Sequence, residues 1–106
     1  MKILITGCRG QLGTELQHQL AEEGCVLGPL PERLRKATVI PVDVDELDIT
    51  DREATINYIR RHQPDTVINC AAFTNVNGCE TSRDAAFGVN AIGPRNLALA
   101  CDKVNA

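Results

Sequence analysis

The chain has 106 residues, a formal net charge of −3 and 43% hydrophobic residues, which fits one small domain with a single core. The mild acidity argues against nucleic-acid and membrane partners, and no apolar run reaches the roughly 18 residues of a membrane span. The N-terminus predicts a strand rather than a signal peptide, and the five cysteines form no CxxC pair, so we expect a cytoplasmic protein with reduced thiols.

The first strand and helix are predicted from apolar periodicity. Residues 2–6 form a short apolar run that ends at a glycine, as a buried strand does. Residues 11–23 have the spacing of an amphipathic helix, and Gly24 suits the C′ position that closes it. The apolar face of this helix carries Leu12, Leu16 and Leu20.

Residues 25–36 are ambiguous. Their first four residues, CVLG, favour a strand, whereas two prolines and a cluster of charges favour a loop. We interpret the segment mainly as a loop, and a strand at CVLG stays an open alternative.

The next predicted strand and helix follow this segment. Residues 37–42 predict a strand that Pro41 shortens, bulges or places near an edge. Residues 51–62 predict a helix whose N-cap is Thr50 or Asp51. Two residues of this helix are expected to face the core, Ile56 and Ile59.

The last predicted unit is a buried strand at residues 66–70 and a helix over residues 82–103, which Gly93 and Pro94 interrupt or kink. The alternation of strands and helices predicts an α/β fold. We expect a parallel sheet that helices cover on both faces.

The segment TGCRGQLG, residues 6–13, carries the main functional signal, because its glycines end a predicted strand and open a predicted helix. In such a turn Gly7 permits the tight bend, Gly10 lets backbone amides approach a pyrophosphate, and Gly13 permits close packing of helix on strand. The helix N-terminus then favours the anion. This context predicts a nucleotide site rather than an ordinary tight turn.

Four segments occur together in a characteristic order: TGCRGQLG, ELDITD at 46–51, NCAAFTNV at 69–76 and VNAIGPRNLA at 89–98. They resemble the extended short-chain dehydrogenase/reductase superfamily and, more narrowly, the dTDP-4-dehydrorhamnose reductases. The resemblance implies that residues 1–106 are the N-terminal part of an NAD(P)-binding Rossmann domain, without the catalytic and substrate-binding portion. The implied fold is α/β, a Rossmann-like doubly wound parallel sheet truncated at about four strands with flanking helices. Because an uncovered sheet edge recruits another chain, we expect a homo-oligomer. The residues expected next to the uncovered surface are Val67, Ile68, Val89, Ile92 and Leu97. It implies a parent oxidoreductase of dTDP-rhamnose biosynthesis that uses NADP or NAD to reduce the 4-keto group of a dTDP-4-dehydro-6-deoxyhexose, a nucleotide-sugar.

The resemblance also implies a set of cofactor-binding residues. Asp48 and Ile49 match the segment that lies against the adenine, and residues 71–74 follow a strand, where small side chains leave room for the cofactor to cross the carboxyl edge. The predicted set is Gly7, Gly10, Gln11, Leu12, Gly13, Asp43, Asp48, Ile49, Ala71, Ala72, Phe73 and Thr74.

Asp43 is predicted to accept hydrogen bonds from the adenosine ribose, as an acid at a strand end does in Rossmann sites. Such an acid is expected about 20 residues after the glycines, whereas Asp43 lies 30 residues after Gly13. We therefore treat GPLPERLRKA as an insertion before the strand. If CVLG is the second strand instead, the acid is missing and Arg33 or Arg35 meets a 2′-phosphate. The choice between NAD and NADP stays open.

Two positions concern the substrate side and a metal. Val76-Asn77-Gly78 stand where the family commonly has Val-Asp-Lys, which removes two charges near the substrate side. Glu15 matches a glutamate implicated in magnesium binding at some family dimer interfaces, so magnesium is possible in the parent. An exposed helix face predicts that this carboxylate is simply solvated here.

No residue of this chain is predicted to be catalytic. Reduction in this superfamily uses a tyrosine with a lysine four residues on, and the chain has no Y-x-x-x-K. Tyr58 precedes His62 at that spacing, but it lies on a surface helix and is interpreted as structural. We therefore expect the chain alone to be inactive. A non-catalytic NAD(P)-binding regulatory module and a sister sugar-nucleotide epimerase or dehydratase are the alternative hypotheses.

Overall fold

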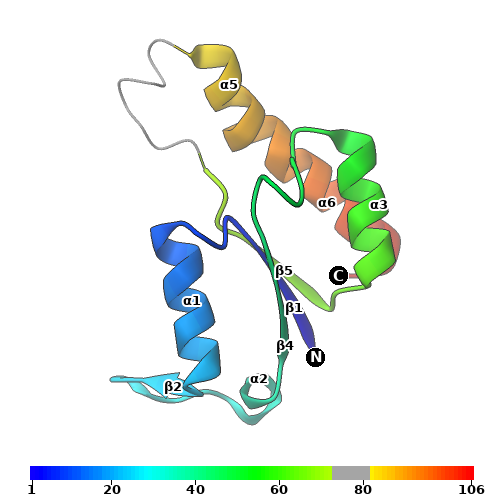
Figure 1. Cartoon of the computed structure of the whole chain (residues 1–106). Helices are drawn as coiled ribbons and strands as arrows, with labels where there is room; N and C mark the ends of the chain where they lie inside the picture. Colours follow the sequence, from blue (N-terminus) through cyan, green and yellow to red (C-terminus); the bar gives the residue numbers. More distant parts are fainter. Residues whose placement is uncertain (73–81) are drawn as a thin grey trace.

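Three parallel strands form the central sheet in a computed structural model that describes residues 1–72 and 82–106 (Figure 1). The strands are β1 (Lys2–Thr6), β4 (Thr38–Val42) and β5 (Thr66–Asn69), in the order β4-β1-β5. β1 is buried from Ile3 to Thr6, as the middle strand of a parallel sheet must be. The predicted Rossmann-like α/β fold is confirmed, with three strands rather than about four in the sheet of the described residues.

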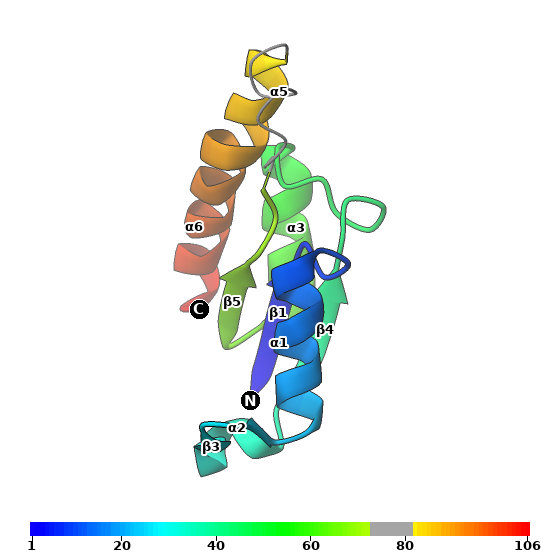
Figure 2. The ribbon, with the colours of Figure 1, turned by 90° about the vertical axis from the view of Figure 1, so that its left-hand side faces the viewer.

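Helices cover both faces of the sheet. α1 (Gln11–Ala21) lies on one face, and α3 (Arg52–His62) and α6 (Gly93–Val104) lie together on the other (Figures 1 and 2). The main core forms between the sheet and the α3–α6 pair. Its buried residues are Leu4, Val42, Leu47, Ile49, Ile59, Leu97 and Ala100.

The segment at CVLG does not enter the central sheet, so the alternative of a second strand there is wrong. β2 (Gly24–Cys25) pairs antiparallel with β3 (Gly28–Pro29) in a separate two-stranded hairpin, and the short helix α2 (Glu32–Arg35) follows. The strand beside β1 is β4, so the residues between α1 and β4 lie outside the central sheet.

The end of α1 differs from the prediction. The helix ends at Ala21 with Glu22 as its C-cap, and Glu23 takes the left-handed conformation with φ of 59°. Gly24 is therefore not the C′ residue. A Cβ on Gly24 would come within 2.8 Å of the Gly28 carbonyl oxygen, so the hairpin rather than the helix end requires a glycine there.

The face of α1 is also less regular than its leucine spacing predicts. Leu16 and Leu20 are partly buried, but Leu12 is 60% exposed. Leu97, expected beside an uncovered surface, is instead 4% exposed within the core. That prediction was wrong because α6 packs its Leu97 face inward beside α3.

The caps and interruptions of the remaining helices follow the prediction more closely. Asp51 is the N-cap of α3, and its carboxylate accepts a hydrogen bond of 3.0 Å from the Ala54 amide. The last helix has three parts: α5 (Arg83–Phe87), a π-helical turn η1 (Gly88–Ile92) and α6. The wide turn lies directly before Gly93 and Pro94, where the proline ring would otherwise clash with a carbonyl one turn earlier. Within the described ranges, no helix is long and apolar enough to cross a membrane.

Candidate functional site

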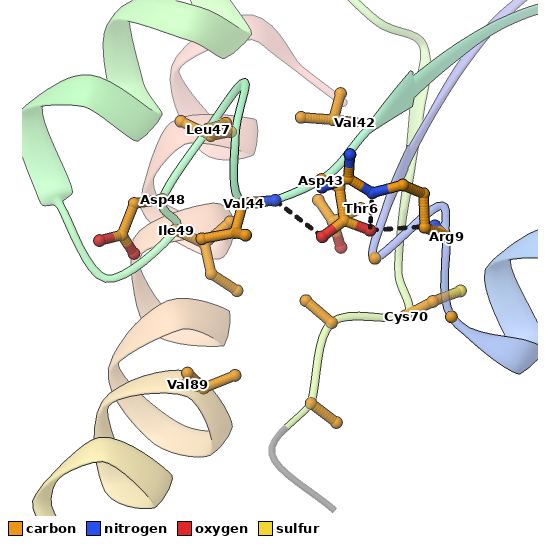
Figure 3. A pocket seen from close by; sticks show the side chains of 14 residues that line it. Thr6, Arg9, Val42, Asp43, Val44, Leu47, Asp48, Ile49, Cys70 and Val89 are labelled. Carbon is orange, nitrogen blue, oxygen red and sulfur yellow. Dashed lines mark hydrogen bonds and ion pairs between the residues drawn. The ribbon is translucent and has the colours of Figure 1, made fainter.

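A cavity of about 450 Å³ opens where the three parallel strands end (Figure 3). One side of it is formed by the turn after β1 and by the residues that follow β5. The loop between β4 and α3 forms the other side, together with Val89 of η1. The lining residues are Thr6, Gly7, Arg9, Gly10, Val42, Asp43, Val44, Leu47, Asp48, Ile49, Cys70, Ala71, Ala72 and Val89. The carboxyl edge of a parallel sheet is the usual ligand-binding position in such folds.

A second cavity, of about 660 Å³, lies against the first turn of α1. It is lined by Gly10, Gln11, Leu12, Glu15, Cys70 and Ala72. Gly10, Cys70 and Ala72 line both cavities, so the two spaces meet at the start of α1. Together they can hold an elongated ligand that crosses the sheet edge.

The three glycines of the first turn differ in their surroundings. Gly7 has a φ of 62°, and a Cβ there would come within 2.6 Å of the Cys70 carbonyl carbon. A Cβ on Gly13 would overlap the Gly7 carbonyl oxygen, so α1 packs directly on the turn. Gly10 has only that same oxygen within 4 Å of its Cβ position, at 3.3 Å, and it faces both cavities. Gly7 thus makes the turn, Gly13 permits the packing, and Gly10 stands at the open side.

The N-terminus of α1 carries amide groups that the helix itself does not use. Gly10 is the N-cap and has no side chain to accept their hydrogen bonds. The first helical bond is donated by the Thr14 amide to the Gly10 carbonyl oxygen, at 2.9 Å. The amides of residues 11–13 therefore have no partner within the helix, and the helix dipole adds positive potential where the two cavities meet. Such a helix start favours a phosphate.

Asp43 ties the end of β4 to the glycine turn. Its carboxylate accepts hydrogen bonds from the Arg9 amide at 2.9 Å and the Val44 amide at 2.8 Å (Figure 3). The Arg9 Nε atom lies 3.7 Å from the same carboxylate. These amides, chiefly that of Arg9, hold the pKa of Asp43 below its ordinary value. Asp43 is therefore a carboxylate at neutral pH, and it lies at the mouth of the cavity.

The loop before α3 forms the wall opposite the glycine turn. The Asp48 carboxylate accepts hydrogen bonds from the amide and hydroxyl of Thr50, at 3.0 and 2.6 Å, and it points away from Asp43 in Figure 3. Ile49 is buried, and a Cβ on Gly93 would come within 2.5 Å of its Cδ1 atom. The Ile49 carbonyl oxygen accepts a hydrogen bond of 2.9 Å from the Asn96 side chain. Ile49 is thus a fixed apolar part of the cavity wall.

Several lining residues were not predicted from the sequence. Thr6 donates a 2.5 Å hydrogen bond to the Asn69 side chain, and the Ala71 amide donates to the same oxygen at 3.2 Å, which ties the ends of β1 and β5 together. Their pairing follows from the parallel register, in which Thr6 is opposite Asn69. Arg9 lies within the glycine motif itself, and its position in that turn could have predicted that it lines the cavity.

The structure brings most of the predicted cofactor residues to this edge. Gly7, Gly10, Asp43, Asp48, Ile49, Ala71 and Ala72 line the first cavity, and Gln11 and Leu12 line the second. Gly13 lies behind the turn. Phe73 and Thr74 are outside the described residues, as are Val76, Asn77 and Gly78.

The two arginines considered for a 2′-phosphate lie elsewhere, so that alternative is wrong. Arg33 lines an apolar groove with Met1 and Thr66, at the opposite ends of β1 and β5. Arg35 donates a hydrogen bond to the Leu30 carbonyl oxygen at 2.8 Å. Both belong to α2, which lies far from the glycine turn in Figure 1.

Neither Cys8 nor Tyr58 has the surroundings of a reactive group. Burial, helped by Asp43 and Glu46, raises the pKa of the Cys8 thiol, which opposes thiolate reactivity. Tyr58 stacks on His62 with ring centroids 4.3 Å apart, and burial raises the pKa of its hydroxyl. It lines a separate hollow with Glu46 and Arg61. Tyr58 therefore takes no part in the cavity at the sheet edge.

Comparison with known proteins gives the family. Residues 1–106 match the family described as the RmlD substrate binding domain. The chain belongs to this family. Its match to the RmlD substrate binding domain extends over the whole chain, so the fold and the cavity described above are those of a family member.

Relatives of this RmlD-family chain are much longer than it is. A dTDP-4-dehydrorhamnose reductase from Mycobacterium tuberculosis is 40% identical over 105 residues, which are 99% of this chain and 30% of the relative. A crystal structure of a dTDP-4-dehydrorhamnose reductase from Clostridium acetobutylicum superposes with a TM-score of 0.86 at 46% identity, over 100% of this chain and 34% of that one. The corresponding enzyme from Bacillus anthracis, solved in complex with NADP, has a TM-score of 0.79 at 37% identity, over 99% of this chain and 34% of that one. The chain thus spans about a third of the length of these relatives.

Proposed function

We propose that residues 1–106 are the N-terminal part of an NAD(P)-binding Rossmann domain. The observation that carries the proposal is the meeting of two cavities at a helix N-terminus whose N-cap has no side chain. A dinucleotide is an elongated ligand with a pyrophosphate near its middle. The amides of residues 11–13 suit that pyrophosphate, and the cavities on either side suit the two nucleoside halves.

Each half has a matching set of side chains. In the first cavity, Asp43 would accept hydrogen bonds from the ribose, and Ile49 would pack on the adenine, with Asp48 beside it. In the second, Leu12 offers apolar surface near the start of α1. The small side chains of Ala71 and Ala72 leave space along the sheet edge. Phe73 and Thr74 follow them in the sequence and complete the proposed set.

For the whole protein we propose reduction of the 4-keto group of a dTDP-4-dehydro-6-deoxyhexose, a step of dTDP-rhamnose biosynthesis in the cytoplasm. The names of the relatives at 40% and 46% identity support this substrate class. The NADP in the Bacillus anthracis structure supports a nicotinamide cofactor. When bound, that cofactor supplies hydride. This chain's residues hold the nucleotide and shield it from water, while the proton donor lies outside the chain, since the sequence has no Y-x-x-x-K.

Two finer features belong to the same proposal. Glu15 is exposed at the second cavity, and its carboxylate accepts a hydrogen bond of 2.5 Å from the Gln19 side chain. Among residues 1–72 and 82–106, no group of three or more acidic, histidine or cysteine side chains could hold a metal ion. Magnesium at Glu15 would take its remaining ligands from water or from groups outside the described residues, and we propose a homo-oligomer on separate grounds below.

Calorimetric titration of the 106-residue chain with NAD⁺ and NADP⁺ tests the cofactor proposal. We expect wild type to bind, and Gly10→Val to lose binding while the domain stays folded, because the branched Cβ would enter the space where the cavities meet. Gly88→Ala is the control, since its Cβ would meet only the Thr50 methyl, at 3.5 Å. Unchanged affinity in Gly10→Val would refute the site.

Turnover is a separate test. The same chain, mixed with NADPH and a dTDP-4-keto-6-deoxyhexose, should show no oxidation of NADPH, because no side chain here can supply the tuned proton. A substrate-dependent rate would contradict the assignment of catalysis to the rest of the protein.

A further inference from the structure

Arg9 is the one cationic side chain that lines either cavity among the described residues. It stands between two carboxylates. Its Nη2 atom lies 2.9 Å from Asp45 Oδ2, and its Nε atom lies 3.7 Å from Asp43 Oδ2. The closer partner of Arg9 is therefore Asp45, which does not line the cavity, whereas Asp43 does.

The two carboxylates are engaged differently. Asp43 is held by two backbone amides and its side chain is 20% exposed, so it is fixed in place. Asp45 is 69% exposed and Arg9 is 56% exposed. An ion pair this open to water contributes little to stability and exchanges readily. The Arg9 guanidinium is thus free to leave Asp45 for a stronger anion.

The position of Asp43 indicates which anion Arg9 would bind in place of Asp45. A carboxylate at this strand end accepts from the ribose hydroxyls of NAD, and an arginine near it accommodates the 2′-phosphate of NADP. Asp43, Asp45 and Glu46 all repel a 2′-phosphate, and among the described side chains that line the cavity only Arg9 is positively charged. A phosphate offers a guanidinium two parallel hydrogen bonds and more charge than a carboxylate does.

Resting on the proposed function, we propose that Asp45 sets the selectivity between NADP and NAD by competing with the nucleotide 2′-phosphate for Arg9. Asp43 and Arg9 then allow the site to accept both nucleotides. Asp45 lowers the affinity for NADP alone, because the unphosphorylated ribose of NAD does not bind the Arg9 guanidinium.

Calorimetry with NAD⁺ and NADP⁺ on the 106-residue chain tests this competition. Asp45→Asn should raise the affinity for NADP⁺ by about fivefold and leave that for NAD⁺ within about twofold. Arg9→Gln should lower the affinity for NADP⁺ by about tenfold or more, with little effect on NAD⁺. The matched controls are Asp102→Asn on α6 and Arg33→Gln on α2, which should not alter the ratio.

The double variant separates competition from simple repulsion. If Asp45 acts through Arg9, the gain from Asp45→Asn shrinks in the Arg9→Gln background; a gain retained in full there would overturn the proposal. A ratio of affinities unmoved by Asp45→Asn, in a chain that binds both nucleotides, would overturn it too and leave the cofactor site standing. A wild-type chain that binds neither nucleotide would overturn both the site and its selectivity.

Discussion

A glycine is required for a different reason at each of three positions of the first turn, Gly7, Gly10 and Gly13. Gly7 needs the left-handed backbone and has the backbone of residues 70–71 against it, whereas Gly13 has the Gly7 carbonyl against it. Of the three, only Gly10 lines both cavities and has no atom closer than 3.3 Å to its Cβ position. Substitutions at these positions should therefore separate folding from binding.

Gly7→Ala should destabilise the domain by at least about 2 kcal/mol, because a Cβ would strain a φ of 62° and overlap the Cys70 carbonyl carbon at 2.6 Å. Gly88→Ala should lie within about 1 kcal/mol of wild type, on the stabilising side, since Gly88 is helical and its Cβ position is free of overlap. Urea unfolding followed by circular dichroism measures both. Equal stabilities of the two variants would contradict the assigned role of Gly7.

Asp43 should make the stability depend on pH in the acid range. Its pKa in the folded protein is lowered, chiefly by the Arg9 and Val44 amides. The stabilisation is therefore present above the ordinary pKa of about 4 and is lost as the pH falls through the lower folded-state pKa. Two charged groups lie close to Asp43: Arg9, whose Nε atom is 3.7 Å from its carboxylate, and Glu46, whose carboxylate accepts a hydrogen bond from the Asp43 backbone amide.

The measurement is the free energy of unfolding of wild type and Asp43→Asn in urea, between about pH 6 and about pH 2.5. Wild type should be the more stable at pH 6, by about 2 kcal/mol, and the difference should shrink toward the acid end. Asp45→Asn, which removes an exposed carboxylate, is the control and should show little change. A constant difference across the range would argue against a charged Asp43 at the turn.

At the residue scale, the sequence predicted positions that require a particular backbone conformation or that lie at the end of a strand. Asp43 was placed correctly at the end of the strand beside β1, despite its distance from the glycines, because the strand at 38–42 has a clear apolar pattern. The contact between Arg9 and Asp45 was not predictable. It joins two exposed side chains across the chain, and neither local spacing nor hydropathy encodes such a pair.

At the element scale, α3 and α6 are joined through the loop that forms the cavity wall. The Asn96 amide, 1% exposed, donates to the Ile49 carbonyl oxygen at 2.9 Å, and Thr55 approaches the same oxygen at 3.4 Å. The Asn96 Oδ1 atom has no hydrogen-bond partner among the described residues. The Asn96 side chain of α6 thus fixes the backbone of Ile49.

Asn96→Ala should cost about 2 kcal/mol of stability, because it removes a buried hydrogen bond and leaves space between α6 and the loop. Asn57→Ala, an exposed asparagine of α3, is the matched control and should be nearly neutral. Urea unfolding gives both values. If Asn96→Ala lowers the stability no more than Asn57→Ala does, the hydrogen bond from Asn96 to Ile49 is not what fixes the loop.

The elements themselves were predictable to different degrees. β1 and α3 follow from apolar runs and a capping aspartate, which act locally. The β2–β3 hairpin was missed because strands of two residues have no periodicity to detect. The π-helical turn η1 was anticipated only as an interruption at Gly93 and Pro94. The sequence shows that a proline disturbs the helix there, but not that the backbone responds with a π-helical turn.

At the scale of the whole molecule, an apolar groove of about 490 Å³ lies between α1, α2 and the sheet, opposite the glycine turn. Among the described strands, none pairs with the outer edge of β5. The apolar residues of the groove are Met1, Ile3, Leu16, Leu20, Leu30, Pro31, Leu34 and Ile68. Such a surface beside a free strand edge favours association.

We predict that the 106-residue chain self-associates at micromolar concentration and that Leu20→Glu shifts it toward monomer, because a charge in the groove opposes burial. Leu12→Glu, on the same helix but outside the groove, should leave association unchanged. Analytical ultracentrifugation measures the distribution. A monomeric wild type that binds no hydrophobic dye would contradict the prediction.

The most direct test of the central claim, a dinucleotide site at the carboxyl edge of the sheet, is an NMR titration of the labelled chain with NADP⁺. Amide resonances of Gly10, Gln11 and Leu12 should shift most, with those of Asp43 and Ile49, because they surround the two cavities. Amides of α2, at the other end of the sheet, should not move. Shifts confined to the apolar groove, or no shifts at millimolar nucleotide, would contradict the account.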